Sequence, residues 1–170
     1  FNTGVATGDA SVGTDTLVDI NFVLGSAYND TLTGGNAGNN TIGEFFQGGA
    51  GNDIINGGTG WDRADYDYAP SGAVANISAS TLLAGTYGDI TLVGDVAAGT
   101  ARDGYGNTDT LTSIEGLRGS TGNDILIGSD NNVTQTFWMN AAESFQGMGG
   151  NDYIDGQGGR DRRRGRVAAR

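Results

Sequence analysis

The sequence contains no cysteine, no histidine and no lysine, and it has one proline. Without cysteine it can form neither a disulfide framework nor a thiolate zinc site. Without histidine, cysteine and lysine it also lacks the usual general bases, thiol nucleophiles and Ser-Lys dyads. One proline argues against a collagen or a proline-rich linker. We therefore expect no catalytic residues in this chain.

Long apolar runs are lacking too. No stretch approaches the roughly 20 apolar residues of a membrane-spanning helix, and no N-terminal signal segment is visible. We expect no membrane span, and the export signal of a secreted protein would have to lie outside this sequence.

Positive charge is scarce in most of the chain. Residues 1–159 hold 19 of the 20 acids but only Arg63, Arg102 and Arg118. So many acids with so few partners repel one another and disfavour a compact state unless something neutralises them. A divalent cation would do so.

Glycine is abundant, at 32 positions, and only 36% of the residues are apolar. Glycine costs backbone entropy inside helices and strands, so this content indicates many turns and little regular structure. Such a composition is poor material for a compact α/β enzyme.

The chain is a tandem duplication. Residues 15–34 align without gaps onto 109–128 with ten identities in twenty positions, and 46–62 align onto 145–161 with ten identities in seventeen. Between the copies, short β-like runs such as AVANIS and DITLV alternate with small polar residues, without helical periodicity. We expect a first copy at 1–65, a β-rich connecting segment at 66–103, a second copy at 104–161 and a basic tail at 162–170.

A finer period of nine runs through each copy. GGAGNDIIN (48–56) is followed by GGTGWDRAD (57–65), GMGGNDYID (147–155) by GQGGRDRRR (156–164), and degenerate units occupy 25–33 and 119–127. Each unit predicts a six-residue glycine turn ending in Asp, then a three-residue strand whose middle residue is buried. Those middle residues include Leu32, Ile55, Leu126 and Ile154.

This nonapeptide resembles the Gly-Gly-x-Gly-x-Asp-x-large apolar-x pattern of the repeats-in-toxin (RTX) proteins. The resemblance implies an all-β fold, a parallel β-roll or β-solenoid in two duplicated segments. It also implies several Ca²⁺ ions as cofactor, because Ca²⁺ takes 6 to 8 oxygen ligands from carboxylates and backbone carbonyls. A secreted, extracellular protein exported by type I secretion is implied as well.

The family's roll has eighteen residues per coil, so each site would lie between units two apart, with carbonyl ligands from the turn and a side-chain ligand from its sixth position. The implied facing sets are Ser26, Tyr28 and Asp30 against Gly48, Ala50 and Asp53; Asn36, Gly38 and Asn40 against Gly57, Thr59 and Asp62; Ser120, Gly122 and Asp124 against Gly147, Gly149 and Asp152; and Gly128, Asp130 and Asn132 against Gly156, Gly158 and Asp161. Asp15 and Asp109 suggest one more site per copy, shared with Asp30 and Asp124. Asn replaces Asp at 40 and 132, which should weaken those two sites.

Other interpretations remain open at this point. Trp61, Trp138, Phe46 and Phe145 could form a glycan-stacking face, although Phe-Gln before each glycine turn is better explained as a packing anchor. The basic tail could bind nucleic acid by charge, but it stands where the first copy continues as WDRADYDY, so a non-native end explains it equally well and we expect no nucleic-acid partner. The calcium module could be a structural or adhesive repeat, with a cell-surface or glycan target reached through the parent protein. It could instead be the non-catalytic accessory domain of a secreted protease, lipase or epimerase.

Overall fold

The computed structural model describes residues 3–8, 14–35, 43–130, 142–158 and 161–164. Every regular element within these residues is a β-strand, so they include no helix of the length and apolarity that crossing a membrane requires. The strands are β1 (Thr3–Thr7), β2 (Thr14–Val18), β3 (Phe22–Leu24), β4 (Thr31–Thr33), β5 (Glu44–Gln47), β6 (Ile54–Asn56), β7 (Asp62–Asp65), β8 (Val74–Asn76), β9 (Gly85–Tyr87), β10 (Ile90–Leu92), β11 (Thr100–Arg102), β12 (Thr108–Thr112), β13 (Gly116–Arg118), β14 (Ile125–Ile127), β15 (Glu143–Gln146), β16 (Tyr153–Asp155) and β17 (Asp161–Arg164).

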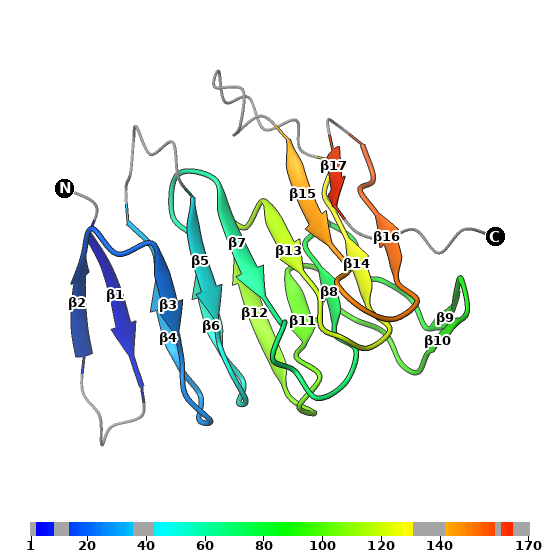
Figure 1. Cartoon of the computed structure of the whole chain (residues 1–170), viewed down its shortest axis with the longest axis horizontal. Helices are drawn as coiled ribbons and strands as arrows, with labels where there is room; N and C mark the ends of the chain where they lie inside the picture. Colours follow the sequence, from blue (N-terminus) through cyan, green and yellow to red (C-terminus); the bar gives the residue numbers. More distant parts are fainter. Residues whose placement is uncertain (1–2, 9–13, 36–42, 131–141, 159–160, 165–170) are drawn as a thin grey trace.

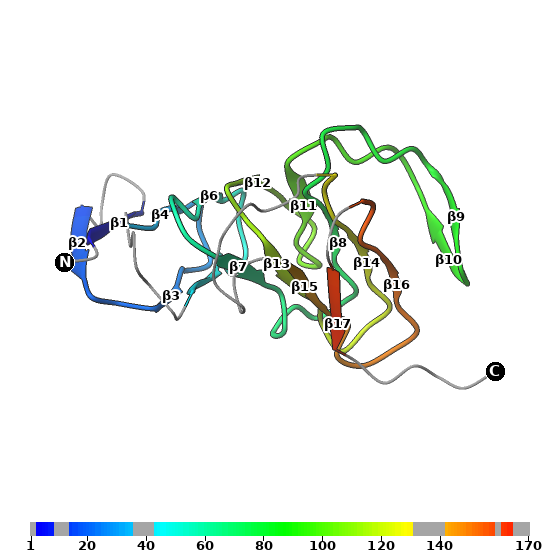
Figure 2. The same cartoon turned by 90° about the horizontal axis from the view of Figure 1, so that it is seen from above.

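Two sheets form the body of the molecule, seen as two layers in Figure 2. The small sheet has the order β17-β15-β13-β7-β5-β3 and is parallel throughout. The chain alternates between this sheet and the large, nine-stranded one. We call the turns from small to large sheet forward turns, and those leading back return turns; they lie at opposite edges of the molecule, at the bottom and top of Figure 1.

The large sheet has the order β16-β14-β8-β11-β12-β6-β4-β1-β2. Its repeat strands pair in parallel, with β12 beside β6 and β14 between β8 and β16. Strand β11 pairs antiparallel with both β8 and β12. The connecting segment therefore contributes two strands to the middle of the large sheet and joins the two copies within one sheet.

Two antiparallel hairpins complete the fold. β1 and β2 form one end of the large sheet beside β4. β9 and β10 form a separate ribbon that projects to one side (Figure 2). Beneath this ribbon lies a small second core, made by Leu92, Val96, Ile125 and Ile127. The rings of Tyr87 and Tyr153 pack edge to face, with their centroids 5.2 Å apart.

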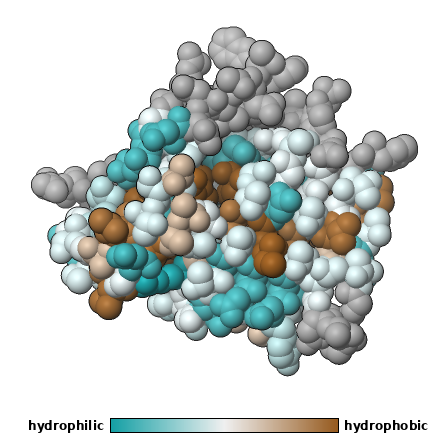
Figure 3. Space-filling view, turned by 180° about the vertical axis from the view of Figure 1, so that it is seen from behind, coloured by the Kyte–Doolittle hydropathy of each residue, from teal (hydrophilic) through white to brown (hydrophobic). Residues whose placement is uncertain are grey.

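The main core is a thin layer between the sheets. Leu32, Ile55 and Leu126 point into it from the large sheet, and Phe46 and Phe145 from the small one. Their neighbours point outward because successive side chains of a strand alternate between faces; Ile54, for example, is 50% exposed. In the view from behind, apolar residues lie in separate patches among hydrophilic ones (Figure 3).

The structure confirms several predictions. The described chain is all-β with parallel segments, and the middle residues of the repeat strands are buried, except that Ile154 is only partly so. Closure of the strands into one solenoid stays a prediction. Residues 162–164 of the predicted basic tail continue β17, which pairs with β15; residues 165–170 lie outside the described residues.

Candidate metal sites

A row of aspartates follows the forward turns. The N–H of Asp30 donates to Oδ1 of Asp53 at 2.9 Å, and the N–H of Asp53 donates to Oδ1 of Asp109 at 3.0 Å. Farther along, the N–H of Asp124 donates to Oδ1 of Asp152 at 3.1 Å. Each Asp thus links its own turn to the next one in the stack. We call Asp30, Asp53, Asp109, Asp124 and Asp152 the forward row.

Glycine makes the close stacking of these turns possible. Gly49 and Gly51 adopt positive φ, at 98° and 124°. A Cβ on Gly51 would lie 2.6 Å from the carbonyl of Tyr28 in the turn before it. Positive φ is accessible to glycine without steric cost, so these positions let carbonyl oxygens of one turn approach the backbone of the next.

The structure places two predicted sets side by side. The turn with Ser26, Tyr28 and Asp30 stacks on the turn with Gly48, Ala50 and Asp53, and the N–H of Asn52 donates to Oδ1 of Asn29 at 2.8 Å. In the second copy, Ser120, Gly122 and Asp124 stack on Gly147, Gly149 and Asp152, where the N–H of Gly149 donates to the carbonyl of Ser120 at 3.3 Å. Their role as calcium ligands stays a prediction.

The two sites suggested by Asp15 and Asp109 are arranged differently from the prediction. Asp15 is exposed on β2, whereas Asp30 immediately precedes β4. Strand β1 lies between β2 and β4, so the two aspartates are not on neighbouring strands. Asp109 meets Asp53 rather than Asp124, because β11 and β8 stand between β12 and β14. The pairing of Asp15 with Asp30, and of Asp109 with Asp124, is therefore wrong.

A second row of acids follows the return turns. The N–H of Glu44 donates to Oδ1 of Asp62 at 3.0 Å, and the N–H of Asp62 donates to Oε2 of Glu115 at 2.9 Å. Strand register then sets Glu143 beside Glu115 and Asp161 beside Glu143. We call Glu44, Asp62, Glu115, Glu143 and Asp161 the return row.

Three glutamates of this row were missed by sequence reasoning. It assigned the positions opposite Asp62 and Asp161 to Asn40 and Asn132, which with Asn36 and Gly38 lie outside the described residues; Glu44 and Glu143 are opposite instead. A signal was available, because the three glutamates, like Asp62, stand two residues before an inward-facing apolar side chain, as Glu44 stands before Phe46. The inserts after 34 and 128 hide this spacing from a nine-residue register.

Glycine turns also stack on one another beside the return row. The N–H of Thr59, two residues after Gly57, donates to the carbonyl of Gly35 at 3.3 Å. Gly128 lies against the carbonyl of Gly156. The N–H of Gly158 donates to Oδ1 of Asp130 at 3.1 Å.

Two return-row glutamates also border a small cavity. It has a volume of about 190 Å³ and is lined by Glu115, Glu143, Ser113, Ser129 and the apolar side chains of Ile77, Leu111 and Ile114. Glu143 accepts hydrogen bonds from the N–H and the hydroxyl of Ser129. Carboxylate and hydroxyl groups and hydrocarbon side chains therefore line the cavity together.

Burial makes both rows electrostatically costly. It raises the pKa of Asp53 and of Asp124 to about 6, from an ordinary 3.8. It raises the pKa of Asp62 and Asp109 to about 7, and that of Glu115 from 4.5 to about 7. Neighbouring acids of the same row add to the increase, while backbone N–H donors offset part of it. At neutral pH a substantial part of this buried negative charge has to be balanced.

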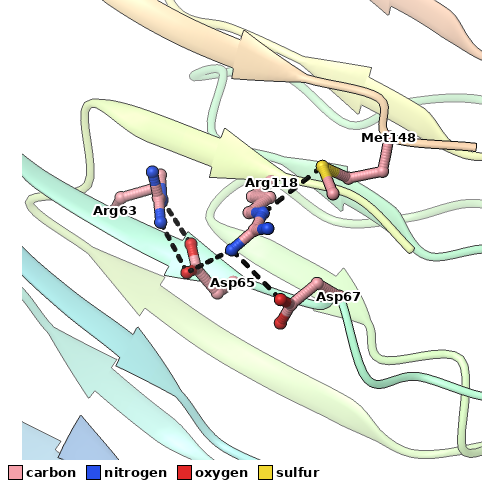
Figure 4. Close-up of polar contacts among 5 residues, drawn as sticks. All are labelled: Arg63, Asp65, Asp67, Arg118 and Met148. Carbon is pink, nitrogen blue, oxygen red and sulfur yellow. Dashed lines mark hydrogen bonds and ion pairs between the residues drawn. The ribbon is translucent and has the colours of Figure 1, made fainter. Parts of the chain in front are cut away.

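The arginines with described side chains are engaged elsewhere. Figure 4 shows Arg63 and Arg118 on the small sheet, where Arg63 pairs with Asp65 and Arg118 lies 3.0 Å from Asp67 and 3.8 Å from Asp65. Arg118 also contacts the sulfur of Met148 at 3.4 Å. Arg102 donates to backbone carbonyls of the connecting segment. These arginines thus neutralise the small-sheet pair Asp65 and Asp67 rather than the two rows.

The donor atoms fit a hard cation. One carboxylate oxygen of Asp53, Asp62, Asp103 and Asp109 is buried without a hydrogen-bond partner, a state that costs free energy unless a cation or a proton satisfies it. Among the described residues no three His, Cys, Asp or Glu side chains form a ready metal site. Carbonyl oxygens of the turns would therefore complete any coordination shell, which is the mixture of oxygen ligands that Ca²⁺ accepts.

The predicted aromatic surface is largely internal. Phe46 and Phe145 are each 1% exposed, which confirms the packing-anchor interpretation. Trp61 packs edge to face on Phe45, whose ring centroid is 6.2 Å away, and its indole N–H donates to the carbonyl of Ala142 at 3.1 Å. Trp138 lies outside the described residues.

Stacked glycine turns with acids at both edges of a two-sheet body define a class of β-protein with acid-lined turns. The RTX calcium-binding nonapeptide repeat matches the chain in four copies, at residues 9–42, 43–67, 117–132 and 140–162, which together make up more than half of it. The chain belongs to this family and is a calcium-binding module. The repeat is a structural calcium-binding element rather than a catalytic one. No curated protein and no solved structure matches the chain significantly.

Proposed function

We propose that this chain is a calcium-dependent folding module of a secreted bacterial protein, in which the glycine turns and the two acid rows bind several Ca²⁺ ions. The observation that carries the proposal is the set of buried carboxylates whose second oxygen has no partner, at Asp53, Asp62 and Asp109. These acids have raised pKa values, and the described arginines lie elsewhere. Calcium would supply both the missing partner and the missing charge.

The thin core explains why binding and folding would be coupled. One apolar layer contributes about 25 cal/mol per Å² of buried area, while ordering each backbone residue costs about 1–2 kcal/mol. A glycine-rich chain is at the upper end of that cost. At a free calcium concentration ten times the Kd, each site adds about 1.4 kcal/mol to stability, so several sites together reach the total stability typical of a domain.

The alternation of strands between two sheets supports a parallel β-roll in which calcium lies between successive turns of each row. The forward row would use Asp30 with Asp53 and Asp124 with Asp152. The return row would use Glu44 with Asp62 and Glu143 with Asp161. A Glu side chain reaches one carbon farther than Asp, so we expect the return-row sites to differ in affinity from the forward-row sites.

Calcium dependence suits a protein exported unfolded. Extracellular calcium modules bind with Kd values of roughly 10⁻⁴–10⁻³ M, so they stay empty where free calcium is low and fill outside the cell. A chain that remains loose inside the cell can pass through a type I secretion channel and fold after release. Within the parent protein the module would serve as a structural or adhesive repeat.

Limited proteolysis at two calcium concentrations tests this proposal. In excess chelator we expect rapid cleavage throughout the chain, and at millimolar calcium we expect a protected body, with a midpoint at roughly 10⁻⁴–10⁻³ M. Magnesium at the same concentration should not protect, because its smaller octahedral shell does not fit carbonyl-rich turns.

Asp124→Asn provides the internal comparison, since it removes a buried carboxylate and keeps an oxygen for the N–H of Ala73. We expect its calcium midpoint to rise by roughly tenfold, because ligand charge tunes calcium affinity. The matched change Asp89→Asn, at an exposed position, should leave the midpoint unaltered. Protection that persists in chelator would refute calcium-dependent folding.

A further inference from the structure

The loop between β11 and β12 stacks on the forward turns although it is not a repeat unit. The N–H of Thr108 donates to Oδ1 of Asn52 at 3.0 Å, just as the N–H of Asn52 donates to Oδ1 of Asn29 at 2.8 Å. The N–H of Asp53 donates to Oδ1 of Asp109 at 3.0 Å, just as Asp30 donates to Asp53. Both ladders of the forward turns therefore continue into residues 103–109.

The backbone of this loop also follows that of a repeat turn. Gly104 and Gly106 adopt φ values of 78° and 106°, compared with 98° and 124° at Gly49 and Gly51. The loop ends, like a repeat turn, in an Asp that precedes a buried apolar position. Yet the chain enters it from β11, antiparallel within the large sheet, and the family repeat has no match between 67 and 117.

Three buried carboxylates interact electrostatically where the loop stacks on the 48–53 turn. Asp53 is 1% exposed, Asp103 and Asp109 are 0% exposed, and one oxygen of each has no hydrogen-bond partner. The other oxygen of Asp103 is held by the N–H groups of Tyr105, Gly106 and Asn107, at 2.8–3.0 Å.

Tyr66 and Arg102 do not balance this charge. The buried Tyr66 hydroxyl lies beside Asp109 without full hydrogen-bond geometry. Arg102, next to Asp103 in sequence, directs its guanidinium to the carbonyls of Val93 and Asp95.

We propose that residues 103–109 act as an additional calcium turn, so that a Ca²⁺ ion binds between this loop and the 48–53 turn. Asp53 and Asp109 supply paired carboxylates from successive turns, Asp103 adds a third negative group beside them, and turn carbonyls complete the shell. This inference rests on the proposed function and extends it to a segment without repeats. The ion would hold the connecting segment against the first copy.

Equilibrium dialysis against excess calcium chloride tests the site by counting bound ions. The double variant Asp103→Asn, Asp109→Asn keeps the amide oxygens that accept the backbone N–H bonds but removes two charges. Its matched control is Asp89→Asn, Asp95→Asn, which removes two charges from exposed positions of the same segment. We expect the control to bind as many ions as the wild type, and the double variant to bind one ion fewer.

Hydrogen exchange of the wild-type chain gives a second measurement that needs no variant. Calcium should protect the amides of residues 103–109 in parallel with those of 48–53. Equal ion counts in the wild type and the double variant would overturn the inference, as would exchange in 103–109 that calcium does not change. A wild type that binds no calcium would refute the proposed function itself, so the two failures are distinguishable.

Discussion

Except for Asp161, each acid of the two rows stands two residues before an inward-facing apolar side chain, as Asp53 does before Ile55 and Glu44 before Phe46. This spacing follows from alternation in a strand, which sends residues i and i+2 to the same side. The sequence alone showed this spacing for the aspartates, because a glycine-containing turn precedes them. For the glutamates the same spacing was present, but inserts of different length precede Glu44 and Glu143 and hid it from a nine-residue register; strand pairing shows that they join the row.

At the residue scale, glycine is required for two separable reasons. Gly51 has φ of 124°, and a Cβ there would lie 2.6 Å from the carbonyl of Tyr28. Gly60 has φ of 139°, but its nearest contact would be 3.7 Å away, at Asp62. We expect Gly60→Ala to show backbone strain alone, roughly 1–3 kcal/mol, and Gly51→Ala to cost more because it also separates two stacked turns.

Urea denaturation at saturating calcium measures the free energy of unfolding of both variants. If Gly51→Ala were no more destabilising than Gly60→Ala, the stacking of the 25–30 and 48–53 turns would not contribute to stability as described.

At the scale of elements, the duplication and the repeat strands could be predicted, but the path of the connecting segment could not. Residues 66–103 showed only a generic β pattern, and their insertion as β8 and β11 depends on pairing with strands far away in sequence. Likewise, nothing local indicates that Asp109 meets Asp53, 56 residues earlier, rather than Asp124. Such pairings are set by which sheet edge is free when the chain returns.

The connecting segment is anchored by one buried side chain. Asn76, at the end of β8, is 0% exposed, and its amide donates to the carbonyls of Ser80, Val96 and Ala97 at 2.9–3.2 Å. Asn76→Ala would remove these bonds, remove the side-chain oxygen that accepts from the N–H and hydroxyl of Ser78 at 3.1 and 2.6 Å, and open a small void. We expect a loss of roughly 2–3 kcal/mol of unfolding free energy.

Ser80→Ala, an exposed change in the same turn, should be near neutral in the same urea titration. If Asn76→Ala left the unfolding free energy nearly unchanged, the β9–β10 ribbon would be held by its own small core instead.

At the scale of the whole molecule, the buried acids make the fold sensitive to pH. The pKa of Asp124 is raised to about 6, and the pKa values of Asp62, Asp109 and Glu115 to about 7. The folded calcium-free chain therefore holds more protons than the unfolded chain between about pH 4 and pH 7. Its stability should fall as pH rises through that window, because these groups favour folding only while protonated.

Saturating calcium should remove this dependence, because it displaces the protons from the same oxygens. We expect the calcium-free chain to show more β-structure at about pH 5 than at about pH 7.5, and this difference to disappear at saturating calcium. Circular dichroism at each pH measures both. A pH-dependent difference in β-structure that persists at saturating calcium would show that the raised-pKa carboxylates are not the ligands.

The central claim is that calcium at the acid rows creates the fold, and far-UV circular dichroism of the chelator-treated chain during a calcium titration tests it most directly. We expect a cooperative transition from a disordered spectrum to a β-sheet spectrum, absent with magnesium and shifted to higher calcium in Asp124→Asn. A chelator-treated chain that already shows the full β spectrum and does not respond to calcium would contradict the claim, and the glycine turns would then be corners of a β-fold that is stable without metal.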